Sequence, residues 1–295
     1  MKEYKGKTLN IMLCSTCNEK CKHCYICYNG DFDERTLNEV IDSFKGEKVI
    51  LNGTEPMLFP KFLKYFKKVN QDYIFTNTKI IMKNPAILDK LKNCGIEKIC
   101  LSYHFGVQDK LNDIPLSQIE ECAKLCKEKG FFVRLNCSLC KDNVHMIEEI
   151  CQKAFEIGAR QIKFTNFIIQ GNAKKYGFDK VALNEDEILE ALNEINRMRK
   201  KYDKSVLEVS RCGSFGNSIQ SKHYCCDAGI DYLTITPDLK LYPCIFFAGL
   251  KEYEMGFYKD GKFWLTKECV HNCDGCLAKK VCNDRLKDFE FLEDV

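Results

Sequence analysis

The sequence predicts an α/β fold: a partial (β/α)6 TIM-like barrel followed by a small C-terminal module rich in cysteine. Short β-branched or apolar runs alternate with amphipathic stretches from residue 8 to about 210, and cysteines become frequent from 225 to 282. The alternation indicates a parallel sheet with right-handed crossovers, and six units leave such a barrel partly open. We therefore expect a barrel domain at 1–210 and the cysteine-rich module at 211–295.

Six strands and six helices account for the barrel. The strands are predicted at residues 8–14, 48–53, 73–77, 96–103, 131–139 and 161–167. The helices carry apolar residues three or four positions apart, as Ile188, Leu192 and Ile195 do in the last one. They are predicted near residues 35–45, 60–70, 85–94, 116–129, 145–158 and 185–202. In this arrangement the loops at the carboxyl ends of the strands form the site.

The composition is that of an ordinary globular protein, with 45% apolar and 29% charged residues. The first residues contain no apolar run long enough for a signal peptide or a membrane span, so we expect a cytoplasmic protein without a membrane partner. The net charge is only +3, and lysines alternate with acidic residues. This pattern does not indicate nucleic acid as a partner.

The chain contains 20 cysteines, which is far above average. Because no export signal is present, metal ligation explains them better than disulfides do. Such a thiol density would suit an anaerobe. Seven cysteines on helix or strand faces are expected to be mostly buried fillers. They are Cys94, Cys100, Cys122, Cys126, Cys137, Cys140 and Cys151.

Three cysteines follow the first strand. Cys17, Cys21 and Cys24 have the spacing Cys-x3-Cys-x2-Cys. Three such thiolates can bind one face of a cuboidal iron–sulfur cluster and leave one iron open for a small molecule. A zinc site is the alternative, since Cys14 and Cys17 also form a Cys-x2-Cys pair. Cys14 and Cys27 are expected to be buried or spare.

This motif, with His23 before its last cysteine and Tyr25 after it, resembles that of the radical S-adenosylmethionine (SAM) superfamily. The resemblance covers residues 8 to about 172. It implies a [4Fe–4S] cluster on Cys17, Cys21 and Cys24 whose open iron chelates SAM, with Tyr25 in the cofactor site. One electron then cleaves SAM to methionine and a 5′-deoxyadenosyl radical, which abstracts a hydrogen atom from the substrate.

The run Asn52-Gly53-Thr54-Glu55-Pro56 resembles the family's Gly-Gly-Glu-Pro motif. The resemblance implies that Gly53 and Glu55 hold the ammonium group of SAM. The run departs from the pattern, because Asn52 replaces the first glycine and Thr54 separates Gly53 from Glu55.

Four further polar residues are implied to bind SAM. Thr76 and Asn77 resemble a Thr-Asn-Gly turn near the methionyl group, and Ser102 matches a serine that contacts the ribose or carboxylate. Asn136 is a polar residue on an otherwise apolar strand. The alternative for each is a hydrogen-bonded turn or a polar residue inside the barrel.

The segment 225–244 resembles the start of a SPASM or twitch domain. Cys226 and Cys244 flank a predicted hairpin around Pro237-Asp238-Leu239, which brings its ends together. Leu239 stands where the family has a glycine.

A second group of cysteines follows, and the resemblance implies one auxiliary [4Fe–4S] cluster on Cys226, Cys244, Cys273 and Cys276. Full SPASM domains have a further cysteine where this chain has Leu286, so a second auxiliary cluster stays open. A zinc ribbon is the alternative. Cys225, Cys269 and Cys282 are candidates for substitute ligands, and Cys212 with Cys269 and Cys282 for a second cluster.

In this family a SPASM or twitch extension occurs mostly in enzymes that act on peptides. We therefore expect crosslinking, epimerisation or oxidation of a ribosomally synthesised peptide or protein, with a flavodoxin or ferredoxin as electron donor. Because the barrel begins near residue 8, we expect a separate protein to bind any leader peptide. Cys225 is predicted to donate a hydrogen atom to the substrate radical. The alternatives are a twitch-type small-molecule dehydrogenase and a non-catalytic iron–sulfur electron carrier.

Overall fold

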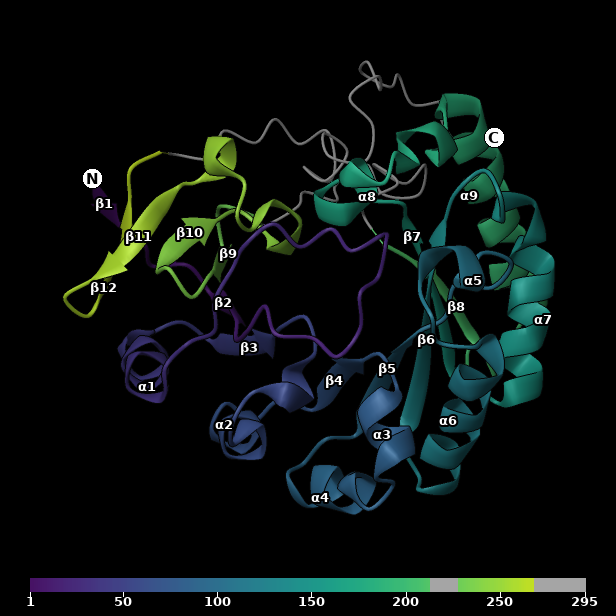
Figure 1. Cartoon of the computed structure of the whole chain (residues 1–295), viewed down its shortest axis with the longest axis horizontal. Coiled ribbons are helices and arrows are strands. Elements are labelled where there is room, and N and C mark those ends of the chain that lie inside the picture. The colour runs from purple at the N-terminus through teal and green to yellow at the C-terminus, as the bar shows by residue number, and fades with distance from the viewer. Residues whose placement is uncertain (213–227, 268–295) are drawn as a thin grey trace.

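The computed structural model describes residues 1–212 and 228–267. Its parallel strands form a partial barrel from two sheets (Figure 1). In the first sheet, β2 (Thr8–Met12) lies between β3 (Lys48–Asn52) and β9 (Tyr232–Ile235) and runs parallel to both. The second sheet contains, in spatial order, β4 (Tyr73–Thr76), β5 (Lys98–Ser102), β6 (Phe132–Leu139), β7 (Gln161–Asn166) and β8 (Glu208–Arg211).

All six predicted strands are present as β2 to β7. The strand β8 was not predicted, because it is only four residues long and carries no clear alternation. It pairs in parallel with β7, so the barrel sheet extends to Arg211.

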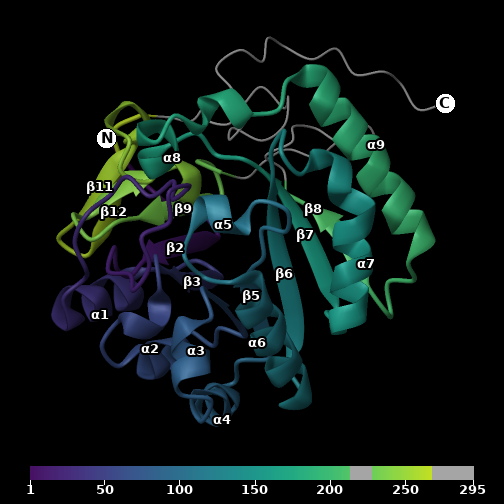
Figure 2. The ribbon, with the colours of Figure 1, turned by 45° about the vertical axis from the view of Figure 1, so that its right-hand side comes forward.

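The six predicted helices are also present, and they cover the outer face of the barrel (Figures 1 and 2). They are α1 (Glu34–Ser43), α2 (Phe62–Lys68), α4 (Ile87–Asn93), α6 (Leu116–Glu128), α7 (Ile147–Ile157) and α9 (Glu185–Lys201). Three short helices join them: α3 (Lys79–Lys83), α5 (Gln108–Leu111) and α8 (Gly171–Lys175). None of the helices in the described ranges is long and apolar enough to cross a membrane.

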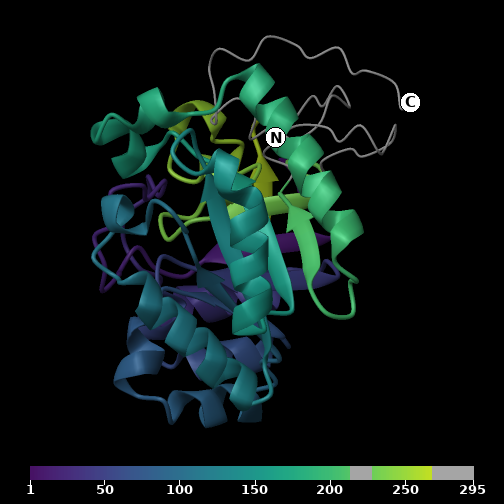
Figure 3. The same cartoon turned by 90° about the vertical axis from the view of Figure 1, so that its right-hand side faces the viewer.

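The helix α9 shows why these segments are helical. Asn184 and Glu187 form a capping box, which satisfies backbone N–H groups of the first turn. Acidic residues in the first turn and basic residues in the last turn oppose the helix dipole. One face buries Ile188 and Ile195, and α9 lies beside α7, where Arg197 pairs with Glu148 (Figure 3).

The strand β6 has two distinct faces. Val133, Leu135 and Leu139 are buried against the helices, whereas Arg134 and Asn136 alternate with them and lie on the inner face of the sheet. The apolar core at β6 therefore lies between sheet and helices, and the inner face of this strand carries polar residues.

The C-terminal strands extend the first sheet. From β9 the sheet continues through β10 (Lys240–Tyr242), β11 (Gly256–Lys259) and β12 (Lys262–Leu265) to β1 (Lys2–Glu3). The predicted hairpin around Pro237-Asp238-Leu239 is confirmed as β9–β10. Leu239 has φ +64°, the left-handed conformation that glycine adopts most easily.

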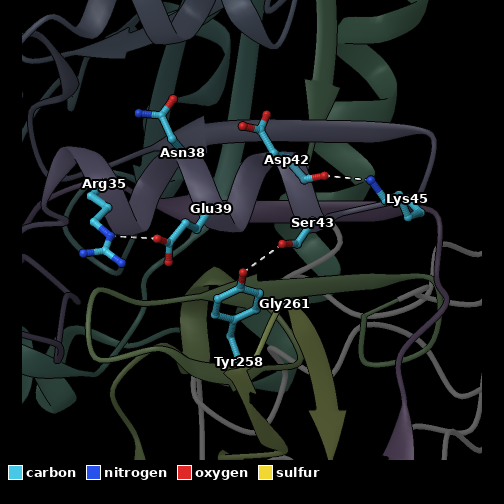
Figure 4. Close-up of a pocket in the computed structure, with 8 residues that line it drawn as sticks. All are labelled: Arg35, Asn38, Glu39, Asp42, Ser43, Lys45, Tyr258 and Gly261. Atoms are coloured by element: carbon cyan, nitrogen blue, oxygen red, sulfur yellow. Dashed lines mark hydrogen bonds and ion pairs between the residues drawn. The ribbon is translucent and has the colours of Figure 1, made fainter.

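A surface hollow of about 740 Å³ lies between α1 and the β11–β12 turn (Figure 4). Across it, Ser43 Oγ and Tyr258 OH are hydrogen-bonded at 2.8 Å. Arg35 pairs with Glu39 at 2.9 Å on the same surface. Because its polar groups bind one another and none of the predicted site residues lines it, we interpret the hollow as a junction between α1 and the hairpin.

Candidate functional site

The cysteine loop, residues 13–30, begins at the carboxyl end of β2. Its base is closed by a bridge between Cys14 and Asp31. The Asp31 carboxylate accepts hydrogen bonds from the backbone N–H groups of Ser15 and Thr16, at 2.9 and 3.2 Å. The loop thus leaves and rejoins the barrel at one point, and the predicted cluster ligands lie in between.

The three thiols of this loop lie within electrostatic reach of one another. Burial raises the pKa of Cys21 to about 12, and the charges of Cys24, Glu19 and Cys17 raise it further. Burial also raises the pKa values of Cys17 and Cys24. The protein alone therefore does not hold these groups as thiolates, whereas bound iron would supply the compensating positive charge.

The thiols are not arranged around a single ion. Among the described residues, no group of three His, Cys, Asp or Glu side chains could hold one metal ion. A zinc site requires ligands that converge on one point, whereas the thiolates of a cuboidal cluster bind different irons and stand farther apart. The described residues therefore do not offer the convergent ligands of a zinc site, and three thiols are the donor set of a cluster with one open iron.

The first turn of α8 holds the cysteine loop from one side. Asn172 donates its backbone N–H to the Cys24 carbonyl at 2.8 Å and its side-chain amide to the Cys21 carbonyl at 3.0 Å. Gly171 has φ +54°, and a β-carbon there would lie 2.7 Å from the Cys24 oxygen and 2.8 Å from that of Ile26. Only glycine fits this contact. The sequence analysis missed both residues.

Gly249, after β10, contacts the loop from another direction. Its φ is +88°, and a β-carbon there would lie 2.5 Å from the backbone nitrogen of Tyr28. The Tyr28 hydroxyl donates to the Cys14 carbonyl at 2.8 Å. The cysteine loop is thus packed against segments that follow β7 and β10.

Glu55, Thr76 and Asn77 come together at the ends of β3 and β4. The Thr76 hydroxyl and the Asn77 backbone N–H each donate to Glu55 Oε2 at 2.9 Å. The side-chain amide of Asn77 lies 3.7 Å from Cys17 Sγ. These three predicted site residues are therefore adjacent to one another and to a predicted cluster ligand.

The Glu55 carboxyl is fully buried. Burial raises its pKa to about 7, although hydrogen bonds from Asn77, Thr76 and Met57 lower it. None of the cations in the described part of the chain pairs with it. A buried carboxylate of this kind fits a ligand that brings its own positive charge, such as the ammonium group of SAM.

The departures from the Gly-Gly-Glu-Pro pattern have structural reasons. Asn52 points into the barrel, where its side chain donates to Asn10 Oδ1 at 2.5 Å, and Asn10 in turn bonds to Thr234. At Gly53 a β-carbon would lie 3.0 Å from Cys14 Sγ, so the retained glycine permits a close approach to the cysteine loop.

Ser102 and Asn136 are register partners on β5 and β6. Ser102 is exposed and Asn136 half-buried on the inner face. Thr76, the last residue of β4, is the register partner of Leu101. Ser102 therefore lies one residue beyond the end of β4, at the level of Asn77. Their predicted contacts with SAM stay a prediction.

Tyr25 lies where the cysteine loop meets the C-terminal strands. Its ring contacts Phe246 edge-on, with 5.3 Å between centroids. Burial raises the pKa of Tyr25, and the charges of Cys24, Cys244 and Cys212 raise it further. These three thiols therefore lie within electrostatic reach of the phenol. The other predicted auxiliary ligands and Cys225 lie outside the described residues: Cys226, Cys273, Cys276, Cys269 and Cys282.

Two histidines lie together at the cysteine loop: His23 within it, half-buried with its Nδ1 shielded from solvent, and the buried His104. His23 contacts His104 edge-on at 4.6 Å between centroids. Burial lowers the pKa of His23 to about 4 and that of His104 well below its ordinary value, so both rings are neutral at neutral pH. His104 Nδ1 accepts from the Ser138 N–H. The sequence analysis did not assign His104 a role.

The predicted filler cysteines are buried, except Cys94, which is half-buried and bonds to the Leu63 carbonyl. Cys14 is buried as predicted, and Cys27 is half-buried. Five of the filler thiols, together with Cys14, belong to the hydrophobic clusters of the core: Cys122, Cys126, Cys137, Cys140 and Cys151. Cys100 lies on the inner face of the barrel beside Arg134.

Solved structures of similar fold were found, whereas no family model and no curated protein matches the chain. SuiB of Streptococcus suis bound to the precursor peptide SuiA has a TM-score of 0.66 and 17% identity, over 96% of this chain and 66% of SuiB. The chain thus spans just under two thirds of SuiB. Native anSMEcpe with bound AdoMet (SAM) has a TM-score of 0.68 and 16% identity, over 96% of this chain and 92% of anSMEcpe. Native anSMEcpe with bound AdoMet and the Cp18Cys peptide has a TM-score of 0.68 and 16% identity, over 97% of this chain and 92% of anSMEcpe.

The chain therefore has the partial-barrel fold of radical SAM enzymes. More narrowly, the whole described architecture, barrel and C-terminal antiparallel strands together, is that of the SPASM enzymes SuiB and anSMEcpe.

Proposed function

We propose that this protein is a radical SAM enzyme. The observation that carries the proposal is the buried, unpaired Glu55 carboxyl, connected through Asn77 to the cysteine loop. Cys17, Cys21 and Cys24 would hold the cluster. When bound, the cluster supplies the electron that cleaves SAM to methionine and a 5′-deoxyadenosyl radical.

The residues around Glu55 suit the binding of SAM. Thr76 and Asn77 fix the orientation of the carboxylate by two hydrogen bonds to one oxygen. The other oxygen has only a weak bond, 3.4 Å from the Met57 nitrogen. It is therefore the atom that would accept from the ammonium group, and a charge-assisted bond in a dry site is strong.

An auxiliary cluster near Tyr25 belongs to the same proposal. Cys244 and Cys212 both act on the Tyr25 phenol, which supports ligation at this end of the barrel. We keep Cys226, Cys273 and Cys276 as further ligands and Cys212 as a candidate. The division into a barrel domain, 1–210, and an auxiliary-cluster domain, 211–295, is also part of this proposal.

We infer that the substrate is a peptide or protein. The support is the likeness to SuiB, solved with the precursor peptide SuiA, and to anSMEcpe, solved with the Cp18Cys peptide. Crosslinking, epimerisation or oxidation of such a substrate would begin with hydrogen abstraction. A flavodoxin or ferredoxin would supply electrons, and a separate protein could bind a leader peptide.

The formation of 5′-deoxyadenosine tests the proposal. Protein reconstituted anaerobically with iron and sulfide is mixed with SAM and dithionite, and the products are separated by chromatography. Wild type should release 5′-deoxyadenosine, Cys17→Ser should release none, and Cys27→Ser should match wild type because Cys27 lies in the same loop outside the motif. The absence of 5′-deoxyadenosine from iron-loaded wild type would refute the proposal.

A further inference from the structure

Two cationic side chains lie on the inner face of the five-stranded sheet. Arg134 is on β6 and Lys163 on β7. Their neighbours Leu135 and Ile162 are fully buried in the core between sheet and helices. Since successive side chains of a strand point to opposite faces, Arg134 and Lys163 point into the barrel.

Both cations act on Cys100, which lies on the same inner face. Cys100 and Arg134 are register partners, and the Arg134 guanidinium lies over the Phe75 ring, 4.8 Å from its centroid. Burial raises the pKa of Cys100 to about 11, the charges of Arg134, Lys98 and Lys163 lower it, and the charge of Asp72 makes a smaller raising contribution. Lys163 is therefore within electrostatic reach of Cys100, as Arg134 is.

Neither cation has an anionic partner in the described ranges 1–212 and 228–267. Arg134 Nε is buried without any hydrogen-bond partner there. By contrast, basic residues on the outside often pair, as Lys110 does with Asp142. A positive charge inside a barrel is costly unless an anion accompanies it, so the inner face is suited to an anionic ligand.

The row of residues around Lys163 supplies neutral hydrogen-bonding groups. Asn136 and Ser210 are its register partners on either side, and Ser102 follows Asn136 on β5. Asn77, in the proposed SAM site, follows Thr76 and adjoins the same row. An anion held here would thus lie in the layer of the barrel that contains the proposed SAM site.

We propose that Lys163 and Arg134 form a carboxylate-binding site inside the barrel, which takes a carboxylate of the peptide substrate. This inference rests on the proposed function and adds the substrate class, a peptide with an acidic group next to the position that reacts. Arginine can bind a carboxylate through two N–H groups, and lysine contributes a point charge. The carboxylate comes from an aspartate or glutamate side chain or from the peptide C-terminus.

The test uses capped amino acids as probes for the reconstituted protein. N-acetyl-glutamate amide and N-acetyl-aspartate amide carry the side-chain carboxylate, their glutamine and asparagine counterparts lack it, and N-acetyl-alanine carries only a terminal carboxylate. Binding is measured by saturation-transfer NMR. At least one carboxylate probe should give a signal several-fold stronger than the neutral amides, and the probe that does so identifies the source. Equal signals from acidic and neutral probes would overturn the proposal.

Variants locate the binding. Lys163→Gln and Arg134→Gln should abolish the difference between acidic and neutral probes, whereas Lys163→Arg should keep it. Lys174→Gln is the matched control, because it removes one positive charge from an exposed position on α8. Circular dichroism and iron content are compared with wild type for every variant, and a folded Lys163→Gln protein that still prefers acidic probes would contradict the assignment.

Two further measurements distinguish a substrate carboxylate from that of SAM, and the anion site from the radical chemistry. If Lys163→Gln weakens SAM binding but leaves the probe signals unchanged, the cation holds the carboxylate of SAM and the proposal is wrong. Wild-type protein that forms 5′-deoxyadenosine without preferring acidic probes would refute this inference alone. Preference for acidic probes without 5′-deoxyadenosine would refute the proposed function and leave the anion site standing.

Discussion

Replacement of Glu55 by glutamine tests two effects of the buried carboxylate separately. One is the loss of folding stability when the carboxylate is ionised, and the other is its contribution to SAM affinity. Burial raises the pKa of Glu55 to about 7 from its ordinary 4.5. The folded protein thus favours the protonated form more than the unfolded chain does. The contribution of Glu55 to the free energy of unfolding is therefore highest below pH 4.5 and falls as the pH rises through 7. The loss amounts to about 3 kcal/mol without SAM. Glutamine stays neutral and avoids this loss.

The substitution also preserves most of the local hydrogen bonds. The amide oxygen can take the place of Oε2, which accepts from Thr76 and Asn77, so the NH₂ group disturbs only the 3.4 Å bond from Met57. We therefore expect Glu55→Gln, without SAM at pH 8, to melt roughly 5–10 °C higher than wild type. The difference should shrink towards pH 5.

The effect on SAM has the opposite sign. A neutral amide cannot form the charge-assisted bond to the ammonium group, so SAM affinity should fall about tenfold to a hundredfold. Anaerobic calorimetry on reconstituted protein at pH 8 measures the affinity, and thermal melts from pH 5 to 8 measure the stability. The exposed Glu190→Gln serves as control, with neither quantity changed. Parallel stability curves for wild type and Glu55→Gln would refute the burial argument, and unchanged SAM affinity would refute the binding role.

Three further outcomes are expected. Reconstituted wild type should contain about eight irons per chain. The triple variant with alanine at Cys17, Cys21 and Cys24 should retain about four. A wild-type protein with four irons and zinc would exclude the auxiliary cluster. Asn172→Ala loses the side-chain hydrogen bond to the cysteine loop, which is worth about 1 kcal/mol. A chelator should therefore remove iron from this variant several-fold faster than from wild type. Equal rates of iron removal would contradict a positioning role for Asn172. Cys225→Ala should keep full iron but lose or reroute product; lost iron would make the residue a ligand, and unchanged turnover a bystander.

The sequence was sufficient where the relevant signal is local. Strands β2 to β7 and their helices follow from short-range hydrophobic patterns. The meeting of Glu55 with Thr76 and Asn77 follows because carboxyl ends of neighbouring parallel strands lie at one edge. Any side chains at these strand ends would lie close together, whatever their type. The parallel topology therefore predicts that the three residues are neighbours, and the sequence motif predicts which chemistry they serve.

What could not be predicted depends on contacts between distant segments. Nothing near Gly171 or Gly249 indicates that both pack against the cysteine loop. The inward turn of Asn52 depends on Asn10 and Thr234, which belong to two other strands. The effect of both Cys212 and Cys244 on Tyr25 likewise depends on β8 and β10, which lie in different sheets.

The packing of the cysteine loop also sets an order of events during synthesis. The loop is translated well before the backbone that supports it, which is contributed by Gly171 and Gly249. A ribosome must therefore add more than 200 residues after the loop before both glycines are in place, and such long-range contacts form slowly. Until then the thiols of Cys17, Cys21 and Cys24 lack their native support and are open to oxidation.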